Sequence, residues 1–206
     1  MRKGVGWTAA GIGGGLLGLG IAYLLREKAT PEPDYRVLAS EGELQIRAYP
    51  AVTVAETVVG GPRKHALNEG YRILAAYLTG KSRAGPRLEM RVPVLQDSGD
   101  PMASDPPLFD DQLEGSWRVR FVLPGGEHPD PPEGVALTQM PPRRVGAALF
   151  HGTANDDRLV AAEDRLRGWL ARHGEKCLTT EPEYAFYNSP MIPPPLLRNE
   201  VLLPLA

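Results

Sequence analysis

The feature that most constrains the fold is an internal repeat, in which a strand, a helix and two further strands follow one another twice. The first helix is expected between Gly61-Pro62 and Gly80, because proline suits the start of a helix and glycine suits its end. The second is expected from Asn155, whose side chain can cap a helix, to Gly174. Two such halves can pair their strands into one sheet.

Alternation of apolar and polar residues places the strands around these helices. The strands are expected at residues 44–54 (with a bend at Tyr49-Pro50), 88–94, 117–123, 135–137, 144–150, 184–188 and 201–205. In the 117–123 strand, Trp117 and Phe121 share the face that is expected to point inward, and Arg118 and Arg120 share the opposite face.

The predicted fold class is α+β, with duplicated β-α-β-β units that form a distorted antiparallel β-barrel flanked by two helices, preceded by an N-terminal membrane helix. Each flanking helix carries an apolar stripe that is expected to pack on the outside of the barrel. The predicted inward residues are Leu67, Tyr71, Leu74 and Leu78 in the first helix, and Leu159, Ala162, Leu166, Trp169 and Leu170 in the second.

The N-terminal segment differs in composition from the rest of the chain. No charged residue occurs from Trp7 to Leu25, and a helix rising about 1.5 Å per residue would let this run cross a bilayer. We therefore predict a membrane anchor over residues 1–28, a linker over 29–34 and a single domain over 35–206. A cleavable signal segment is the alternative for residues 1–28. The domain is expected on the periplasmic or extracytoplasmic side of the membrane.

Composition excludes several function classes. The net charge is −2, and no cluster of Lys and Arg occurs in residues 35–206, which argues against nucleic-acid binding. Cys177 is the single cysteine, so an internal disulfide framework is excluded. None of the familiar hydrolase or metalloprotease motifs is present, which favours a binding module over an enzyme. The oligomeric state does not follow from the sequence.

Short motifs occur in a fixed order from about Tyr35 to Leu205. They are the run from Glu43 to Pro50 (ELQIRAYP), the helix from Gly70-Tyr71 to Gly80, the segment 88–94 (LEMRVPV), Phe150-His151-Gly152, Tyr187-Asn188-Ser189-Pro190 and Arg198-Asn199-Glu200-Val201. Together they resemble the SOUL family of haem-binding proteins, in which a Thr usually stands at the position of Arg91. The resemblance implies the same barrel with two outer helices.

The resemblance also implies a ligand, namely haem or a related tetrapyrrole held in an apolar groove beside the first helix. Some members carry a histidine, proposed as an iron ligand, at the position of Ala48, so any haem here is expected to be weakly or non-axially ligated, and the metal ligand stays unassigned. The candidate haem-binding residues are Leu67, Tyr71 and Leu74 against the ring, Arg63 and Lys64 at the propionates, and His65 on the polar face of the same helix.

Other functions remain open from the sequence. The fold also resembles bacterial effector-binding domains, which take up hydrophobic small molecules with a buried glutamate, and Glu200 is the candidate for that role unless it forms a buried ion pair with Arg198. A scaffold that docks a partner at the cell envelope is a further alternative. Peroxidase-like chemistry on adventitious haem is the weakest of these hypotheses.

Overall fold

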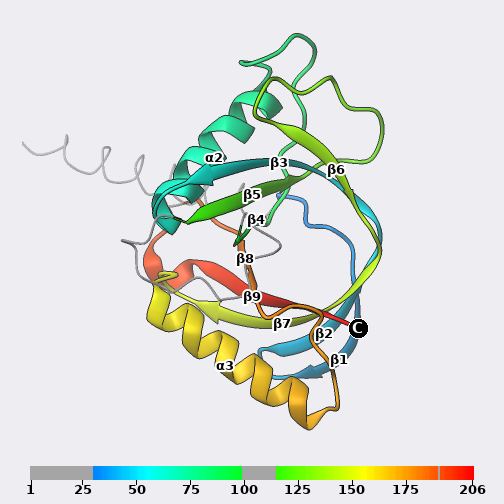
Figure 1. The fold of residues 1–206 in the computed structure, drawn as a ribbon, viewed down its shortest axis with the longest axis vertical. Coiled ribbons are helices and arrows are strands. Elements are labelled where there is room, and N and C mark those ends of the chain that lie inside the picture. Colours follow the sequence, from blue (N-terminus) through cyan, green and yellow to red (C-terminus); the bar gives the residue numbers. More distant parts are fainter. Residues whose placement is uncertain (1–29, 99–114, 190) are drawn as a thin grey trace, which may run out of the picture. The chain divides into compact units, whose positions relative to one another are not determined.

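One curled antiparallel sheet carries both halves of the repeat (Figure 1). The computed structural model describes residues 30–98, 115–189 and 191–206, and residues 31–206 form one unit by their contacts. Along the sheet the strand order is β1-β2-β7-β9-β8-β4-β5-β3-β6. The strands are β1 (Arg36–Glu41), β2 (Leu44–Tyr49), β3 (Val52–Gly60), β4 (Val94–Ser98), β5 (Ser116–Val122), β6 (Ala136–Met140), β7 (Arg143–His151), β8 (Glu183–Phe186) and β9 (Arg198–Leu205).

The duplication is visible in the strand order. The run β4-β5-β3-β6 in one half matches β8-β9-β7-β2 in the other, and the halves join where β4 pairs with β8. The predicted distorted antiparallel barrel is confirmed in its coarse form, because the sheet is a curled half-barrel that stays open between β1 and β6. Closure would require β6 to pair with the opposite edge, and the β1–β2 hairpin takes that edge instead.

Both helices pack on the convex side of the sheet (Figure 1). Helix α2 (Arg63–Thr79) packs on β3 and β5, and α3 (Asp156–Arg172) packs on β7 and β9. A short 3-10 helix, η1 (Pro194–Leu196), precedes β9. The Asn155 side chain accepts a hydrogen bond from the Arg158 backbone N–H at 3.2 Å, so the predicted cap is confirmed. The buried residues of α3 are the five that the sequence predicts.

The inward face of α2 differs from the prediction. Tyr71 is 41% exposed, whereas Tyr77 and Leu74 are fully buried. The cause is Gly70, which lies against β5 so closely that an added Cβ would stand 2.6 Å from Val119 Cγ2. The face of the helix that contacts the sheet is therefore centred on Gly70, and Tyr71 lies at the edge of this contact.

Two predicted strands differ most from the observed ones. The stretch 44–54 is not one bent strand, because β2 pairs with β7 in one half of the sheet while β3 pairs with β5 and β6 in the other. The predicted strand at 88–94 becomes β4 only from Val94. Residues before it run beside α2, where the Leu88 N–H donates to the Leu78 carbonyl at 2.8 Å. Pro93 has no N–H to donate, which suits a position just before the ladder begins.

The predicted anchor, residues 1–28, and the first linker residue, Ala29, lie outside the residues that the structure describes. Among the residues it does describe, no helix is long and apolar enough to cross a membrane. The end of the linker is held by the domain: the Pro31 carbonyl accepts from the Val92 N–H at 3.0 Å, and Glu32 pairs with Arg198 at 2.6 Å.

Candidate functional site

The concave face of the half-barrel carries an alternating ladder of charges. Arg118 donates to both oxygens of Asp97 at 3.0 Å, and Arg120 donates to Asp97 and to Glu183 at 2.7 Å each. Arg143 then donates to Glu183 at 2.6 Å. We call these five residues the arginine ladder. The ladder begins and ends in a guanidinium group. Arg118 and Arg120 lie on the face of β5 opposite Phe121, as the sequence predicts, and this face points to the concave side of the sheet.

The ladder holds its middle more tightly than its ends. All three nitrogens of Arg120 have acceptors, since its Nε also donates to Glu56 at 3.1 Å. The described part of the chain offers no hydrogen-bond acceptor to Nη1 of Arg118, or to Nε and Nη1 of Arg143. The side chains of these two end residues are 24% and 21% exposed, against 9% for Arg120.

Burial and charge oppose each other in the two ladder carboxylates. Burial opposes ionisation of Glu183, but the charges of Arg143 and Arg120 outweigh it and lower its pKa. At Asp97 the burial dominates, and its pKa is raised although Arg118 and Arg120 act against this. Glu183 is thus fixed as the charged centre between two arginines.

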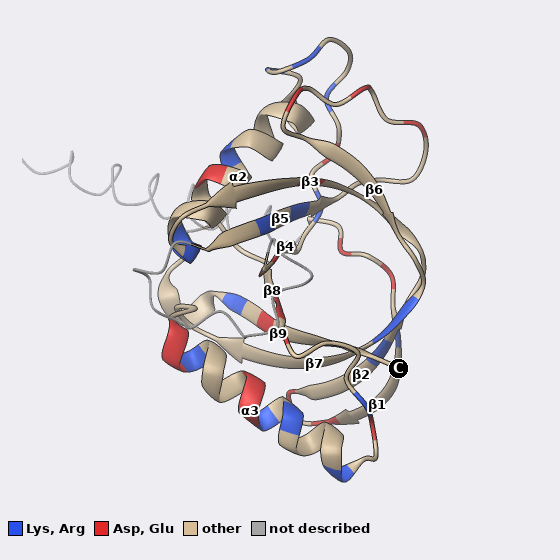
Figure 2. Ribbon diagram, in the orientation of Figure 1, with Lys and Arg blue, Asp and Glu red and all other residues tan. Residues whose placement is uncertain are grey.

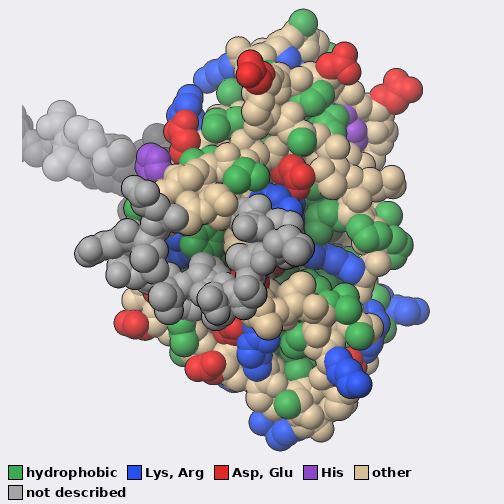
Figure 3. All heavy atoms as spheres, viewed as in Figure 1, with side chains coloured by type: hydrophobic (Ala, Val, Ile, Leu, Met, Phe, Trp, Pro, Cys, Tyr) green, Lys and Arg blue, Asp and Glu red, His purple; other side chains and the backbone are tan. Residues whose placement is uncertain are grey.

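A hollow of about 490 Å³ opens over the ladder, within the range of small-molecule sites, which is roughly 300–1,000 Å³. We call it the ladder hollow. Its polar lining comes from the ladder and from Ser98, Thr179, Thr180 and Glu181, and its apolar lining comes from Met140, Leu178, Pro182 and Pro204. Figure 2 shows the basic residues on β5, and Figure 3 shows Lys and Arg side chains beside hydrophobic ones on this view of the molecule.

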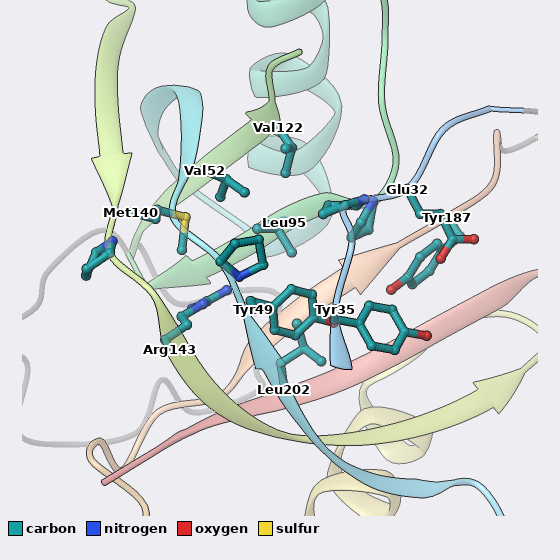
Figure 4. A pocket seen from close by; sticks show the side chains of 14 residues that line it. Glu32, Tyr35, Tyr49, Val52, Leu95, Val122, Met140, Arg143, Tyr187 and Leu202 are labelled. Atoms are coloured by element: carbon teal, nitrogen blue, oxygen red, sulfur yellow. The ribbon is translucent and has the colours of Figure 1, made fainter. Parts of the chain in front are cut away.

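A second, apolar cavity adjoins the ladder hollow. It measures about 30 Å³, room for about two or three water molecules at roughly 10–15 Å³ each. Tyr35 and Tyr49 lie together on one side of it, with Met140 and Arg143 opposite Tyr187 (Figure 4). Met140 and Arg143 line both spaces and therefore form the boundary between them.

Glu200 is fully buried beside this cavity and has four hydrogen bonds. Arg47 donates to both carboxylate oxygens at 2.8 and 2.9 Å, the Tyr187 hydroxyl donates at 2.7 Å, and Arg198 donates at 3.2 Å. Burial opposes ionisation, but the hydrogen bonds and charge of Arg47, with Tyr187 and Arg198, lower the pKa of Glu200. A carboxylate occupied in this way stabilises the fold and has little capacity left to bind a ligand.

The ion pair between Arg198 and Glu200 that the sequence suggests is present, but the main partner is Arg47. Sequence reasoning missed it because 153 positions separate the two residues. The sequence does show that Arg47 lies on the same face of its strand as Gln45 and Tyr49, which indicates a polar face but not its partner.

The six predicted haem-binding residues do not all share one surface. Arg63 is 4% exposed and donates to Asp156 at 2.6 Å, and Leu74 is fully buried, so neither lies on the helix surface. Lys64 and His65 are exposed at the start of α2. Tyr71 is exposed and Leu67 is half-buried, one helical turn apart on the same side.

An apolar strip continues from these two residues onto the neighbouring chain segment. The Tyr71 hydroxyl contacts the sulfur of Met90 at 3.8 Å, and its ring meets Phe121 edge-on at 5.3 Å between centroids. Leu67 and Met90 are half-buried against the same part of the core. We call Leu67, Tyr71 and Met90 the α2 strip.

Metal ligands are not grouped in the described ranges. No cluster of three or more His, Cys, Asp or Glu residues that could hold a metal ion occurs there. His65 remains an exposed side chain near the α2 strip, and the iron ligand stays unassigned.

Solved structures with the same fold differ strongly in sequence. The C-terminal domain of EcmrR matches with a TM-score of 0.56 and 13% identity, covering 84% of this chain and 98% of that chain. An uncharacterized conserved protein from Listeria innocua matches at 0.57 and 13%, covering 82% and 94%. A Listeria innocua hydrolase encoded by lin2189 matches at 0.56 and 12%, with the same coverage. At these identities the likeness shows the fold alone.

No curated protein sequence matches the chain significantly. A protein-family model does: the model described as SOUL heme-binding protein matches residues 30–204, which is most of the chain. The match includes β2 with its Arg47, helix α2 and the final strand β9. This chain belongs to the SOUL heme-binding protein family.

Proposed function

We propose that the protein binds haem or a related tetrapyrrole on the α2 strip. Membership of the family supports the ligand class. The single observation that supports the place is the exposure of Tyr71, a large aromatic side chain left 41% exposed beside half-buried Leu67 and Met90. Aromatic and apolar groups exposed together are a favourable surface for a flat apolar ring.

The residues around the strip fit the tetrapyrrole in part. Lys64 and Arg72 are exposed on α2, where Arg72 pairs with Glu69, and Arg91, next to Met90, is partly exposed with its Nη2 4.0 Å from Glu89. Such basic groups suit propionates. Arg63 and Leu74 are withdrawn from this role by their burial, and the strip itself contains no histidine. A bound haem would supply its own redox and ligand chemistry, and the strip would supply apolar contact.

A hemin titration followed by visible absorption tests this proposal. Leu67→Glu places a carboxylate in the strip and should weaken hemin binding at least about tenfold, because burying a charge against an apolar ring is costly. Leu38→Glu is the matched control, since Leu38 is a 43% exposed leucine on β1 in the other half of the sheet. Equal hemin affinity in both variants would contradict the proposed place.

His65→Ala addresses the iron ligand. Because His65 is exposed at the start of α2, its loss should change hemin affinity no more than a few-fold and leave the spectrum unaltered. Loss of a low-spin spectrum in this variant would make His65 the axial ligand. Hemin loaded on the protein should turn over peroxide no faster than free hemin, because we propose a binding module rather than an enzyme.

We also propose that residues 7–25 tether the protein to a membrane, with the domain on the extracytoplasmic side. The support is the charge-free run in the sequence. Cell fractionation tests it with the full-length chain and a version that begins at Pro31. A spanning helix is not released by ionic strength, so extraction of the full-length chain by high salt alone would contradict the tether.

A further inference from the structure

We propose that the ladder hollow is a second binding site, for a small amphipathic organic acid whose acidic group pairs with Arg143 and whose apolar part lies against Met140 and Leu178. This inference is independent of the α2 strip, which lies on the helix-covered side of the sheet. It rests on three observations: the unused hydrogen-bond donors at the Arg143 end of the ladder, the mixed polar and apolar lining of the hollow, and the boundary that the hollow shares with the apolar cavity.

The ends of the ladder have hydrogen-bonding capacity to spare. Arg143 uses Nη2 for Glu183, while the described residues provide no acceptor for its Nε and Nη1. Its side chain is 21% exposed and lines the hollow. The fork of an arginine matches the two oxygens of a carboxylate, sulfonate or phosphate.

The guanidinium group of Arg143 is already held in position. Glu183, itself 3% exposed, fixes it at 2.6 Å and is fixed in turn by Arg120 at 2.7 Å. A donor that is ordered before the ligand arrives loses less side-chain freedom on binding. The negative charge of Glu183 also offsets the positive charge of Arg143 at long range. We therefore expect recognition by short-range hydrogen bonds rather than strong electrostatic steering of the ligand.

The opposite end of the hollow disfavours an acidic group. Glu181 lines the hollow and hydrogen-bonds Ser98, the residue that follows Asp97, so it lies near the Arg118 end of the ladder. One oxygen of Glu181 is buried without a hydrogen-bond partner among the described residues. Repulsion from this carboxylate favours the Arg143 end for a ligand acid.

The apolar lining determines the rest of the ligand. Leu178 is a large apolar side chain that is 64% exposed at the hollow, and Pro182 and Pro204 line it too. Met140 and Arg143 both line the hollow and the apolar cavity, and their side chains lie near each other in Figure 4. A ligand that places its acid on Arg143 thus has apolar surface on both sides of that contact. A volume of about 490 Å³ suits one or two fused rings.

The probe is anilinonaphthalene sulfonate, an aromatic sulfonate, with N-phenylnaphthylamine as a matched uncharged probe. Fluorescence titrations use the full-length chain. Arg143→Gln should weaken sulfonate binding at least about tenfold, which is the typical contribution of a charge-assisted hydrogen bond to affinity. The affinity for the uncharged probe should not change. Arg144→Gln is the control, because it removes the same charge from the neighbouring position. Arg144 lies on the other face of β7, where it pairs with Glu175.

A second variant keeps the test decisive if Arg143→Gln does not fold. Leu178→Glu alters an exposed side chain, so the fold should survive, and the new carboxylate should repel the sulfonate at the hollow at least about tenfold. Unchanged sulfonate affinity in the folded variants, or an equal loss in Arg144→Gln, would overturn the proposal. An equal loss of both probes in Arg143→Gln would also overturn it, since the acid would then have no part in recognition.

Discussion

Arg47→Met should be among the most destabilising substitutions in the domain, and its cost should depend on pH. Arg47 provides the hydrogen bonds at 2.8 and 2.9 Å that reach both oxygens of Glu200, a side chain with no exposed surface. Removing one partner of a buried pair leaves an uncompensated charge and costs about 3–5 kcal/mol. Tyr187 and Arg198 still donate, so we expect a value near the lower end of this range, about 3 kcal/mol.

The pH dependence follows from the sign of the pKa shift. In the native protein Arg47 helps to lower the pKa of buried Glu200, so this contribution to stability is present above the ordinary glutamate pKa and is lost as the pH falls through the lowered value. Without Arg47, burial dominates and the pKa of Glu200 should rise. The destabilisation caused by the substitution should then be largest near neutral pH, and the difference from the native protein should shrink on acidification.

Urea denaturation of both proteins at neutral and acidic pH measures these differences. Arg47→Met/Glu200→Leu should recover part of the loss, because the buried charge is gone, although the Tyr187 hydroxyl loses its acceptor at a cost of about 1–3 kcal/mol. The reasoning fails if Arg47→Met costs less than about 1 kcal/mol at neutral pH, or if its cost grows as the pH falls.

Two further predictions test the packing of the helices and of β5. Gly70→Ala should destabilise by about 1–3 kcal/mol, because its Cβ would overlap Val119 in β5, whereas Gly168→Ala in α3 meets only ordinary contacts and should stabilise by about 0.5–1 kcal/mol. Phe121→Ala should cost about 3–5 kcal/mol, and Arg118→Ala about 1 kcal/mol. Urea denaturation measures all four, and a reversed order within either pair would contradict the packing.

Helix α3 could be predicted from the sequence in full, whereas α2 could not. In α3, capping by Asn155 and a stripe of large apolar residues such as Leu166 and Trp169 point to the same face. In α2, Gly70 makes the closest approach to the sheet. A search for hydrophobic periodicity places the buried face at large apolar side chains, so it does not detect a contact made by a glycine. The stripe was therefore centred on Tyr71, and the tyrosine that packs inward is Tyr77.

The concave face was harder to predict for a different reason. Arg118 and Arg120 alternate with buried residues, a pattern that usually marks a solvent face in a strand. A curled sheet brings several strands together over that face, so the partners of these arginines come from β4 and β8. Alternation identifies which residues share a side of one strand, but it does not reveal which residues of other strands will pair with them.

The two helices differ in the apolar side chains that they expose, although both carry exposed ion pairs (Arg72 with Glu69 on α2), and this difference supports the proposed place of a flat apolar ligand on the α2 side. Helix α3 presents charges to solvent (Figure 2), with Arg167 paired to Glu163 at 2.7 Å and Arg165 paired to Glu43 at 3.0 Å. An apolar ring placed on α3 would have to displace such pairs from water. At the α2 strip it would cover Tyr71 and remove apolar surface from water, which is the favourable term in binding of this kind.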